Sequence, residues 1–339
     1  MRQELSSAIE EYRSWRTSQD YSKRTLANEK TILNKFLAVT GNVYCHSIED
    51  RHVTNYFAKV SATRQSHTLR LDHTVLGQFF EWCRHTKKMP LDKDPLRGRR
   101  KPKRTHKERN RIPVGQFPHL LDVAGAQDPR DRALVALYLY TLARDQEVAT
   151  LRVQDWDRDG GWLRMVISKS GTEDTMPVSA ELDRELRAWM TVYQGQGHDY
   201  LIPRRYSIGS ERGERGRIIS HEFAYFPDQR IGPANRIVTP ILEKIGFPTT
   251  DAAGRPCGEG AHTIRRSGAR ALFDQLAGQG YDGALRLVQS MLHHSSVAIT
   301  ETYLGISADR RTRDEVIRLR SMYPTAGENV VSLAERMSG

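Results

Sequence analysis

Residues 292–303 read Leu292-His-His294-Ser-Ser-Val-Ala-Ile-Thr-Glu-Thr-Tyr303, and a helix is expected over 296–304. Two adjacent histidines first suggest a metal site. Neighbouring residues of a helix point ~100° apart, however, and rarely bind one ion. The sequence also lacks an H-E-x-x-H motif, so no metal site is expected. Tyr303 taken alone is more often a core aromatic than a nucleophile, so this stretch must be interpreted together with upstream residues.

Two upstream segments contribute guanidinium groups. His262-Thr-Ile-Arg265 places an imidazole and a guanidinium on one face of a helix, because positions i and i+3 are neighbours. Arg144 follows an apolar helix, and Glu147, three residues later, could orient its guanidinium or a neighbouring helix. Each segment also has a plain explanation, a surface pair in the first case and an intrahelical ion pair in the second.

A third segment contributes a lysine. Residues 162–167 and 175–178 are strand-like, and 168–174 form a turn with Lys169 at its tip. A solvated turn lysine is the simpler interpretation of Lys169 alone. Together, the residues form a chemically coherent set: two arginines can hold the oxygens of a phosphate, a lysine can protonate a leaving oxygen, and a phenol can attack.

The composition of the chain is compatible with a partner that contains phosphate groups. The chain has 339 residues and a formal net charge of +11, which favours a polyanion and nucleic acid first. Its three cysteines, Cys45, Cys83 and Cys257, are far apart and show no C-x-x-C spacing, so neither a disulfide framework nor a zinc site is expected. No membrane span or signal peptide is expected, and a reducing cytoplasm fits.

The first block of the chain is expected to be all helical. Helices are predicted over 2–17, 22–39, 48–60 and 62–87, and the core candidates of the last are Leu69, Leu71, Leu76, Phe79, Phe80 and Trp82. A proline-punctuated linker follows over 89–111. Its charge density favours phosphate contact over a plain tether. The predicted DNA-contacting residues are Arg64, His67, Arg70, Arg97, Arg99, Arg100, Lys101, Lys103, Arg104 and Lys107.

The second block is predicted to be a helical domain with a small antiparallel sheet. Helices are expected over 115–125, 129–142, 180–193, 232–245, 262–278, 282–292 and 296–304, beside the hairpin at 162–178. Residues 204–231 are rich in Arg, Gly and Ser and are expected to form a long surface loop. Two further helices are expected in the tail, at 309–321 and 329–337.

Taken in order, these residues resemble the tyrosine recombinase (phage integrase) family, whose pattern is Arg, Lys, His-x-x-Arg, His or Trp, then Tyr. Residues 141–147 resemble T-G-L-R-x-x-E, and 168–178 resemble the family's G-K-G-x-K-x-R-x-V-P-L hairpin with Lys169 in the catalytic slot. Residues 262–269 resemble H-x-L-R-H-x-F-A. Residues 292–303 resemble L-G-H-S-S-x-x-x-T-x-x-Y, with Tyr303 nine positions after His294. The departures are Leu142, Ser168, Ser170, Thr172, Arg266 and His293, none of which removes a catalytic group.

The resemblance implies catalytic roles for Arg144, Lys169, His262, Arg265, His294 and Tyr303, with Glu147 in support. Tyr303 would attack a DNA phosphate and leave a 3′-phosphotyrosyl bond and a free 5′-hydroxyl. The arginines and His294 would stabilise the phosphorane, Lys169 would act as general acid, and His262 would assist proton transfer at Tyr303. The resemblance implies no metal, nucleotide or other cofactor.

The resemblance also implies a mainly α (α+β) fold. A four-helix core-binding (SAM-like) domain would occupy 1–88, the linker 89–111 and the catalytic domain 112–308. A helical tail at 309–339 would contact a neighbouring protomer. The working form would be a clamp around double-stranded DNA at attachment or core sites, assembled as a tetramer, with an accessory DNA-bending or directionality factor as a further partner. The setting would be the nucleoid in the cytoplasm of a prokaryotic host.

Three alternatives remain open at this point: a type IB topoisomerase, a catalytically inactive DNA-binding regulator and a Xer-like dimer resolvase. The helical first block and the tail favour a recombinase over a topoisomerase. The 204–231 insertion and the long basic linker favour an integrase of a phage or mobile element, acting in viral genome integration or excision. An extra arm-site domain is not expected, because the first predicted helix starts almost at Met1.

Overall fold

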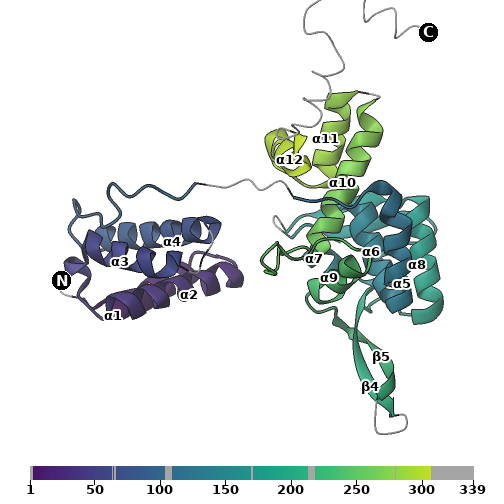
Figure 1. Cartoon of the computed structure of the whole chain (residues 1–339), viewed down its shortest axis with the longest axis horizontal. Coiled ribbons are helices and arrows are strands. Elements are labelled where there is room, and N and C mark those ends of the chain that lie inside the picture. Colours follow the sequence, from purple (N-terminus) through teal and green to yellow (C-terminus); the bar gives the residue numbers. More distant parts are fainter. Residues whose placement is uncertain are drawn as a thin grey trace, which may run out of the picture. The chain divides into compact units, whose positions relative to one another are not determined.

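A computed structural model describes residues 3–62, 64, 66–103, 109–168, 171–212, 218–278 and 280–306. The chain divides into two compact units, Met1–Lys107 and Glu108–Gly339, and the division falls within the predicted linker. Figure 1 shows both units, which are described separately below. The chain is mostly helical with small antiparallel sheets, as the sequence predicts.

The first unit contains four helices, α1 (Leu5–Thr17), α2 (Lys23–Thr40), α3 (Asp50–Ser61) and α4 (Ser66–His85). Their apolar stripes enclose a core in which aromatic rings meet edge to face, as Phe36 does with both Tyr56 and Phe80. Leu71 is 44% exposed, so its prediction as a core residue is wrong. The next residue, Asp72, is buried instead and accepts hydrogen bonds from Tyr56 and Arg64.

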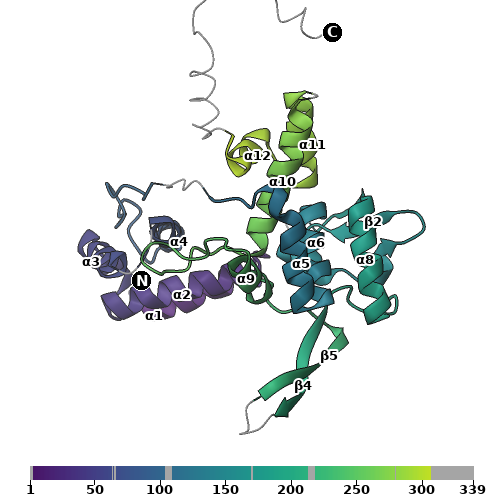
Figure 2. The same ribbon diagram turned by 45° about the vertical axis from the view of Figure 1, so that its right-hand side comes forward.

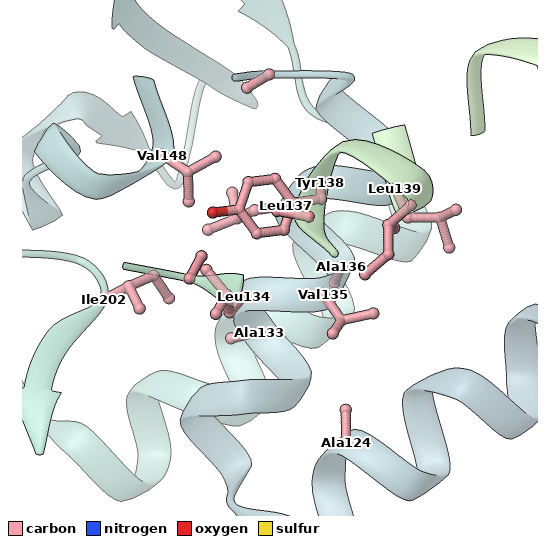
Figure 3. Packing of buried hydrophobic residues seen from close by; sticks show 14 of the residues in the cluster. Ala124, Ala133, Leu134, Val135, Ala136, Leu137, Tyr138, Leu139, Val148 and Ile202 are labelled. Carbon is pink, nitrogen blue, oxygen red and sulfur yellow. The ribbon is translucent and has the colours of Figure 1, made fainter. Parts of the chain in front are cut away.

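The second unit is organised around α6 (Pro129–Thr141), which is apolar on nearly all sides and therefore buried. Figure 3 shows its side chains from Ala133 to Leu139 packed among neighbouring elements. Helices α5 (Phe117–Gln127), α8 (Ala180–Tyr193), α9 (Asn235–Lys244) and α10 (Ala261–Ala277) pack against it. The Asp128 side chain caps its start, Pro129 occupies the first turn, and Leu142 ends it in a left-handed conformation.

A three-stranded antiparallel sheet lies beside these helices. The strands β1 (Trp156–Asp157), β2 (Trp162–Val166) and β3 (Glu173–Pro177) follow in that order, and Met165 pairs with Asp174. Leu163 and Met165 alternate with exposed residues and enter the core. The predicted hairpin is therefore present, and the short strand β1 was not anticipated.

The predicted surface loop over 204–231 is wrong. Strands β4 (Pro203–Arg212) and β5 (Ile218–Arg230) instead form a two-stranded ribbon, which extends away from the helices in Figures 1 and 2. The high content of Arg, Gly and Ser led to the loop prediction. The segment also contains alternating apolar residues that are typical of strands, such as Tyr206 and Ile208 on β4 and Phe223 and Tyr225 on β5. Cross-strand pairing and contacts at the base of the ribbon stabilise the two strands although the segment is polar.

Helices α10, α11 (Tyr281–Met291) and α12 (Val297–Leu304) enclose a separate core cluster that includes Leu142. Gly268 allows α10 to cross α6 closely, since a Cβ at this position would lie 2.5 Å from the carbonyl oxygen of Leu139. The tail predicted to be helical, 309–339, lies outside the described residues. Within the described ranges, no helix combines the length and apolar character needed to span a bilayer.

Candidate active site

The first arginine is positioned by the turn that ends α6. Arg144 precedes α7 (Asp145–Thr150), and its backbone N–H donates to Glu147 Oε2 at 2.6 Å. Its Nη1 donates to Glu147 Oε1 at 2.9 Å. Burial would raise the pKa of Glu147, but the backbone and side-chain hydrogen bonds from Arg144 outweigh it and leave the pKa below its usual range. Glu147 is therefore a buried carboxylate that orients Arg144.

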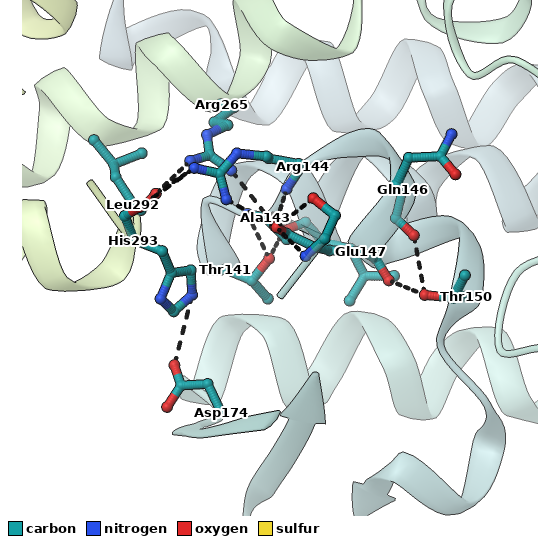
Figure 4. Close-up of polar contacts among 12 residues, drawn as sticks. Thr141, Ala143, Arg144, Gln146, Glu147, Thr150, Asp174, Arg265, Leu292 and His293 are labelled. Atoms are coloured by element: carbon teal, nitrogen blue, oxygen red, sulfur yellow. Dashed lines mark hydrogen bonds and ion pairs between the residues drawn. The ribbon is translucent and has the colours of Figure 1, made fainter. Parts of the chain in front are cut away.

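The second arginine comes from α10 and meets the first at one carbonyl. Arg265 Nη2 donates to the Leu292 oxygen at 2.9 Å, and Arg144 Nη2 donates to the same oxygen at 3.1 Å. Arg265 Nη1 also lies 3.7 Å from Glu147 Oε2. Figure 4 shows both guanidinium groups converging on the backbone at Leu292 and His293. The peptide between α11 and α12 thus brings together Arg144 and Arg265, which lie far apart in the sequence.

This arrangement leaves positive charge and unused donors beside one carboxylate. Arg265 is 1% exposed, and burial lowers the pKa of its guanidinium. Its Nε and Nη1 make no hydrogen bond of ordinary geometry in the described part of the chain, although the Tyr303 hydroxyl and the Glu147 carboxylate lie nearby. Buried donors without acceptors are uncommon in folded proteins. A tetrahedral anion is a ligand that could satisfy them and balance the excess charge.

Tyr303 lies between two histidines at this centre. Its ring centroid is 5.2 Å from that of His262, with the planes at 79°, and 5.2 Å from that of His294, with the planes at 77°. The His294 Nδ1 lies 3.1 Å from Thr300 Oγ1, which fixes the imidazole against the helix that carries Tyr303. The tyrosine hydroxyl is buried and has no hydrogen-bond partner of ordinary geometry among the described residues.

The electrostatics of these groups differ. Burial raises the pKa of Tyr303, and the nearby Arg265 guanidinium opposes that rise. Burial among protein atoms, followed by the charges of Arg265 and Arg266, lowers the pKa of His262 to about 4. Solvent reaches part of His262 and moderates this effect. The imidazole is nevertheless mainly neutral at pH 7, so it can accept a proton.

Lys169 lies outside the described residues. Its neighbour Ser168 is described, and both its backbone N–H and its hydroxyl donate to Glu147 Oε1, at 3.2 and 3.0 Å. Glu147 therefore contacts both arginines and the β2–β3 turn. Sequence reasoning gave Glu147 the task of orienting Arg144 or a neighbouring helix. Nothing in the sequence pattern indicated its contact with the hairpin.

Two departures from the family pattern share an unusual backbone conformation. Leu142 has a φ of 54° and His293 a φ of 49°, both in the left-handed region that favours glycine. These are the positions where the family pattern has glycine. Sequence reasoning set His293 aside. The structure places its backbone oxygen 3.4 Å from Arg144 Nη2 and its Nε2 3.6 Å from Asp174 Oδ2.

Arg266 is a second residue that sequence reasoning left without a role. Its Nη2 donates to Glu259 Oε2 at 2.9 Å and to the Asn110 carbonyl at 2.7 Å. It therefore holds the segment that enters the second unit against α10. The substitution of Arg266 for the family's histidine was the signal available in the sequence.

The predicted DNA-contacting residues belong to the first unit and remain predictions. Arg64 pairs with buried Asp72, and Arg70 Nη1 donates to the Pro102 carbonyl at 3.0 Å. Arg99 Nη2 donates to Thr54 at 2.9 Å. Exposed side chains belong to Arg97, Arg100, Lys101 and Lys103. Arg104 and Lys107 lie outside the described residues, and the side chain of His67 is likewise not described.

No cluster of three or more His, Cys, Asp or Glu suited to a metal ion occurs within the described ranges. The cysteines there, Cys45, Cys83 and Cys257, are free.

Comparison with known proteins places this geometry in a family. A model of the Phage integrase family matches residues 110–310. Tyrosine recombinase XerD of Ralstonia nicotianae is 23% identical over 281 residues, which span 83% of this chain and 82% of the relative. Tyrosine recombinase XerD of Corynebacterium glutamicum is 32% identical over 197 residues, which span 58% of this chain and 54% of the relative.

Solved structures share the fold. A lambda integrase dimer bound to a COC′ core site matches with a TM-score of 0.67 at 14% identity, covering 89% of this chain and 95% of that one. The Tn1549 transposon integrase in complex with a circular intermediate DNA matches with a TM-score of 0.62 at 12% identity, covering 94% and 99%. Since the family model matches more than half of the 339 residues, the chain belongs to the phage integrase family of tyrosine recombinases.

Proposed function

We propose that this protein is a site-specific DNA recombinase that breaks and rejoins DNA through Tyr303. The observation that carries the proposal is the convergence of Arg144 and Arg265 on one carbonyl, with unused Arg265 donors and a buried tyrosine hydroxyl at the same centre. A DNA phosphodiester fits this chemistry because its two non-bridging oxygens accept hydrogen bonds from guanidinium groups.

In the proposed reaction, the Tyr303 oxygen bonds to the scissile phosphorus and the bond from phosphorus to the 5′-oxygen breaks. The product is a 3′-phosphotyrosine and a free 5′-hydroxyl. A 5′-hydroxyl then attacks the phosphotyrosine and releases the tyrosine. Two transesterifications keep the number of phosphodiester bonds constant, so the reaction requires neither nucleotide nor metal.

The residues divide the proton and charge transfers among them. Neutral His262 accepts the phenol proton, which the raised pKa of Tyr303 otherwise keeps in place at pH 7. Arg144, Arg265 and His294 stabilise the charge on the pentacoordinate phosphorus. Lys169 donates a proton to the leaving 5′-oxygen. Glu147 holds Arg144 and the turn that contains Lys169.

The proposed partners are double-stranded DNA at attachment or core sites and further copies of the chain, assembled as a tetramer on two sites. The solved neighbours support this assembly, since they include lambda integrase bound as a dimer to a core site and as a tetramer to a Holliday junction. An accessory DNA-bending or directionality factor completes the proposal. The setting would be the cytoplasmic nucleoid of a prokaryote.

Within the family we favour integration or excision of a phage or mobile element. The match to a transposon integrase and the basic linker support this assignment. A Xer-like dimer resolvase is the second candidate, because the curated relatives include several XerC and XerD recombinases. A plasmid assay with and without paired sites separates both from a type IB topoisomerase, which would relax supercoils without site-dependent exchange.

The direct test is covalent trapping on a nicked suicide substrate built from the genomic DNA that flanks the encoding gene. The wild-type chain should form a protein–DNA adduct, and Tyr303→Phe should form none because the nucleophile is absent. Tyr281→Phe is the matched control, since Tyr281 is an exposed tyrosine of the same unit. Equal adduct from Tyr303→Phe would overturn the nucleophile assignment, and no adduct from the wild type would favour the inactive regulator.

A further inference from the structure

The helix that carries the proposed nucleophile is short, and Tyr303 lies in its last turn. Helix α12 has eight residues, and helices of this length depend on tertiary contacts for their stability. Its first turns are fixed, because the Ser296 hydroxyl accepts from the Ile299 N–H at 3.4 Å and the His294 ring lies 3.1 Å from Thr300 Oγ1. The placement of Tyr303 therefore depends on the contacts that hold the other end of α12.

Two arginines converge on the carbonyl of Leu304, the last residue of α12. Arg111 Nη2 donates to this oxygen at 2.7 Å, and Arg270 Nη1 donates to it at 3.1 Å. Carbonyl groups in the last turn of a helix have no partner within the helix, so these bonds satisfy an acceptor that the helix leaves open. The Leu304 side chain is fully buried in the core cluster of α10, α11 and α12. The residue directly after Tyr303 is thus held by both its side chain and its backbone.

Arg111 lies on the segment through which the chain enters the second unit, and this segment is fixed on both sides of it. The Asn110 carbonyl accepts from Arg266 Nη2 at 2.7 Å, and the Ile112 N–H donates to Ser267 Oγ at 2.9 Å. Both partners belong to α10, beside which the segment runs in Figures 1 and 2. Arg111 therefore reaches the end of α12 from a backbone whose position is defined.

The surroundings of Arg111 differ from those expected of a cation that contacts DNA. It is the last cation of the basic linker, whose charge predicts phosphate contact. Arg109 is exposed, as a phosphate-contacting side chain would be, whereas Arg111 is half-buried. Gly305 follows α12 with a φ of 67°, and a Cβ there would collide with Arg111 Nη2. The close approach of this guanidinium to the helix end therefore requires glycine.

We propose that Arg111 is a positioning residue which, with Arg270, holds the end of α12 and so keeps Tyr303 between His262 and His294. The inference rests on the proposed function and deepens it, since it assigns a cation of the linker to the nucleophile instead of to DNA. Arg270 joins the end of α12 to the helix that carries His262, and Arg111 joins it to the entering segment. Loss of either contact weakens the last turn, where helices fray first, and displaces the phenol.

The test applies three measurements to Arg111→Ala, Arg111→Lys and Arg270→Ala in the full chain. Amide hydrogen exchange of the protein without DNA reports the order of the last turn of α12. Binding to the intact duplex of the suicide substrate, repeated at several salt concentrations, reports the number of phosphate contacts. Single-turnover cleavage of the suicide substrate at saturating protein separates the chemical step from binding.

In Arg111→Ala, the amides of residues 301–304 should exchange about 10-fold faster, while those of α6 keep their wild-type rates. Cleavage should slow about 10-fold, since small displacements of catalytic groups have effects of this size or larger. The dependence of binding on salt should match the wild type, because no phosphate contact is lost. Arg270→Ala should show the same pattern. Arg111→Lys should fall between Arg111→Ala and the wild type, because lysine keeps an N–H donor on a shorter side chain.

Arg184→Ala is the matched control, since Arg184 is an exposed arginine of the same unit, on α8. It should match the wild type in all three measurements. A salt slope lower by about 0.9 in Arg111→Ala, with cleavage at the wild-type rate once bound, would reveal a phosphate contact and overturn the positioning role. Wild-type exchange at residues 301–304, or an equal rise in α6, would overturn it as well. Adduct formation by Tyr303→Phe would instead overturn the proposed function, so the two failures are distinguishable.

Discussion

Two antiparallel hairpins of the second unit, β2–β3 and β4–β5, differ in which residues their polar side chains contact. The β2–β3 hairpin has strands of five residues each and contacts Glu147 and His293 at the candidate active site. The β4–β5 ribbon has strands of 10 and 13 residues and is held at its base. There, Tyr225 donates to Asp128 at 2.9 Å and packs on Trp189, and Arg205 pairs with Asp128.

Both hairpins are connected to α6, but at opposite ends. The ribbon contacts Asp128, which caps the start of the helix, and the short hairpin contacts Glu147, just beyond its end. We therefore expect the same secondary structure to serve stability in one place and the geometry of the proposed catalytic residues in the other. Substitutions at the two contact points should separate these effects, and their expected size decreases through the four experiments below.

Glu147→Ala should have the largest effect. It removes the carboxylate that faces two arginines and leaves buried charge uncompensated, which should lower the free energy of unfolding by about 3 kcal/mol. Cleavage of the suicide substrate by the folded protein should fall at least about 100-fold, because both guanidiniums lose their orientation. Urea denaturation and single-turnover kinetics measure the two quantities.

Glu185→Ala is the control for Glu147→Ala. Glu185 is also buried and paired, with Arg132, but on α8. It should lose stability and keep its cleavage rate once the folded fraction is taken into account. If both variants slow cleavage equally, Glu147 has no special relation to the site.

Asp128→Ala tests the other end of α6. The variant loses the helix cap and the contacts with Tyr225 and Arg205, so the free energy of unfolding should fall by about 2 kcal/mol. Cleavage by the folded protein should stay unchanged. Asp122→Ala, which removes an exposed partner of Arg132, should change stability by less than about 0.5 kcal/mol. A cleavage defect in Asp128→Ala beyond its unfolded fraction would contradict the separation of roles.

Ser168→Ala should have a smaller effect on the catalytic side. It removes the hydroxyl contact with Glu147 but keeps the backbone one, and a hydrogen bond to a charged group contributes about 1.5 kcal/mol. Cleavage should slow about tenfold, as measured in single turnovers. Ser207→Ala makes the same change in the ribbon and should leave the rate as it is. Equal rates for the two serine variants would show that the backbone bond alone holds the turn.

Ile208→Thr should have the smallest effect. Ile208 lies on β4, is 56% exposed, and keeps its β-branched shape in the variant. The melting temperature and the cleavage rate should both match the wild type, because exposed substitutions change stability by less than about 0.5 kcal/mol. Val166→Thr, at a 50% exposed position of β2, is the counterpart in the short hairpin. A loss of cleavage with Ile208→Thr would show that the ribbon takes part in catalysis, which would contradict the expected difference between the two hairpins.

The helices could be predicted from the sequence, and the candidate site residues could be named, because both depend on local signals. Apolar periodicity defined α8, a run rich in Ala, Leu and Tyr defined α6, and the order of Arg144, Arg265, His294 and Tyr303 indicated the candidate site. The ribbon was missed because its pairing is non-local and its composition resembles that of a loop. The burial of Asp72 was missed for a related reason, since its partners Tyr56 and Arg64 come from elsewhere in the fold.

Backbone groups set a further limit on prediction. Arg144 and Arg265 both donate a hydrogen bond to the backbone carbonyl of Leu292. Every residue has such a carbonyl, so no sequence pattern indicates this contact. The backbone conformation of His293 was partly visible in the sequence, because His293 stands where the family pattern has glycine. That signal indicated an unusual backbone, but the contact with Asp174 required the structure.

The approach of α10 to α6 at Gly268 bears on the spacing of the two helices next to the candidate active site. A methyl group at this position would collide with the backbone of Leu139, and only movement of a helix could relieve the collision. Arg265 lies one helical turn before Gly268, and Arg144 follows the end of α6. The single hydrogen atom that glycine carries in place of a side chain therefore sets how closely the helix that carries Arg265 can approach the helix that precedes Arg144.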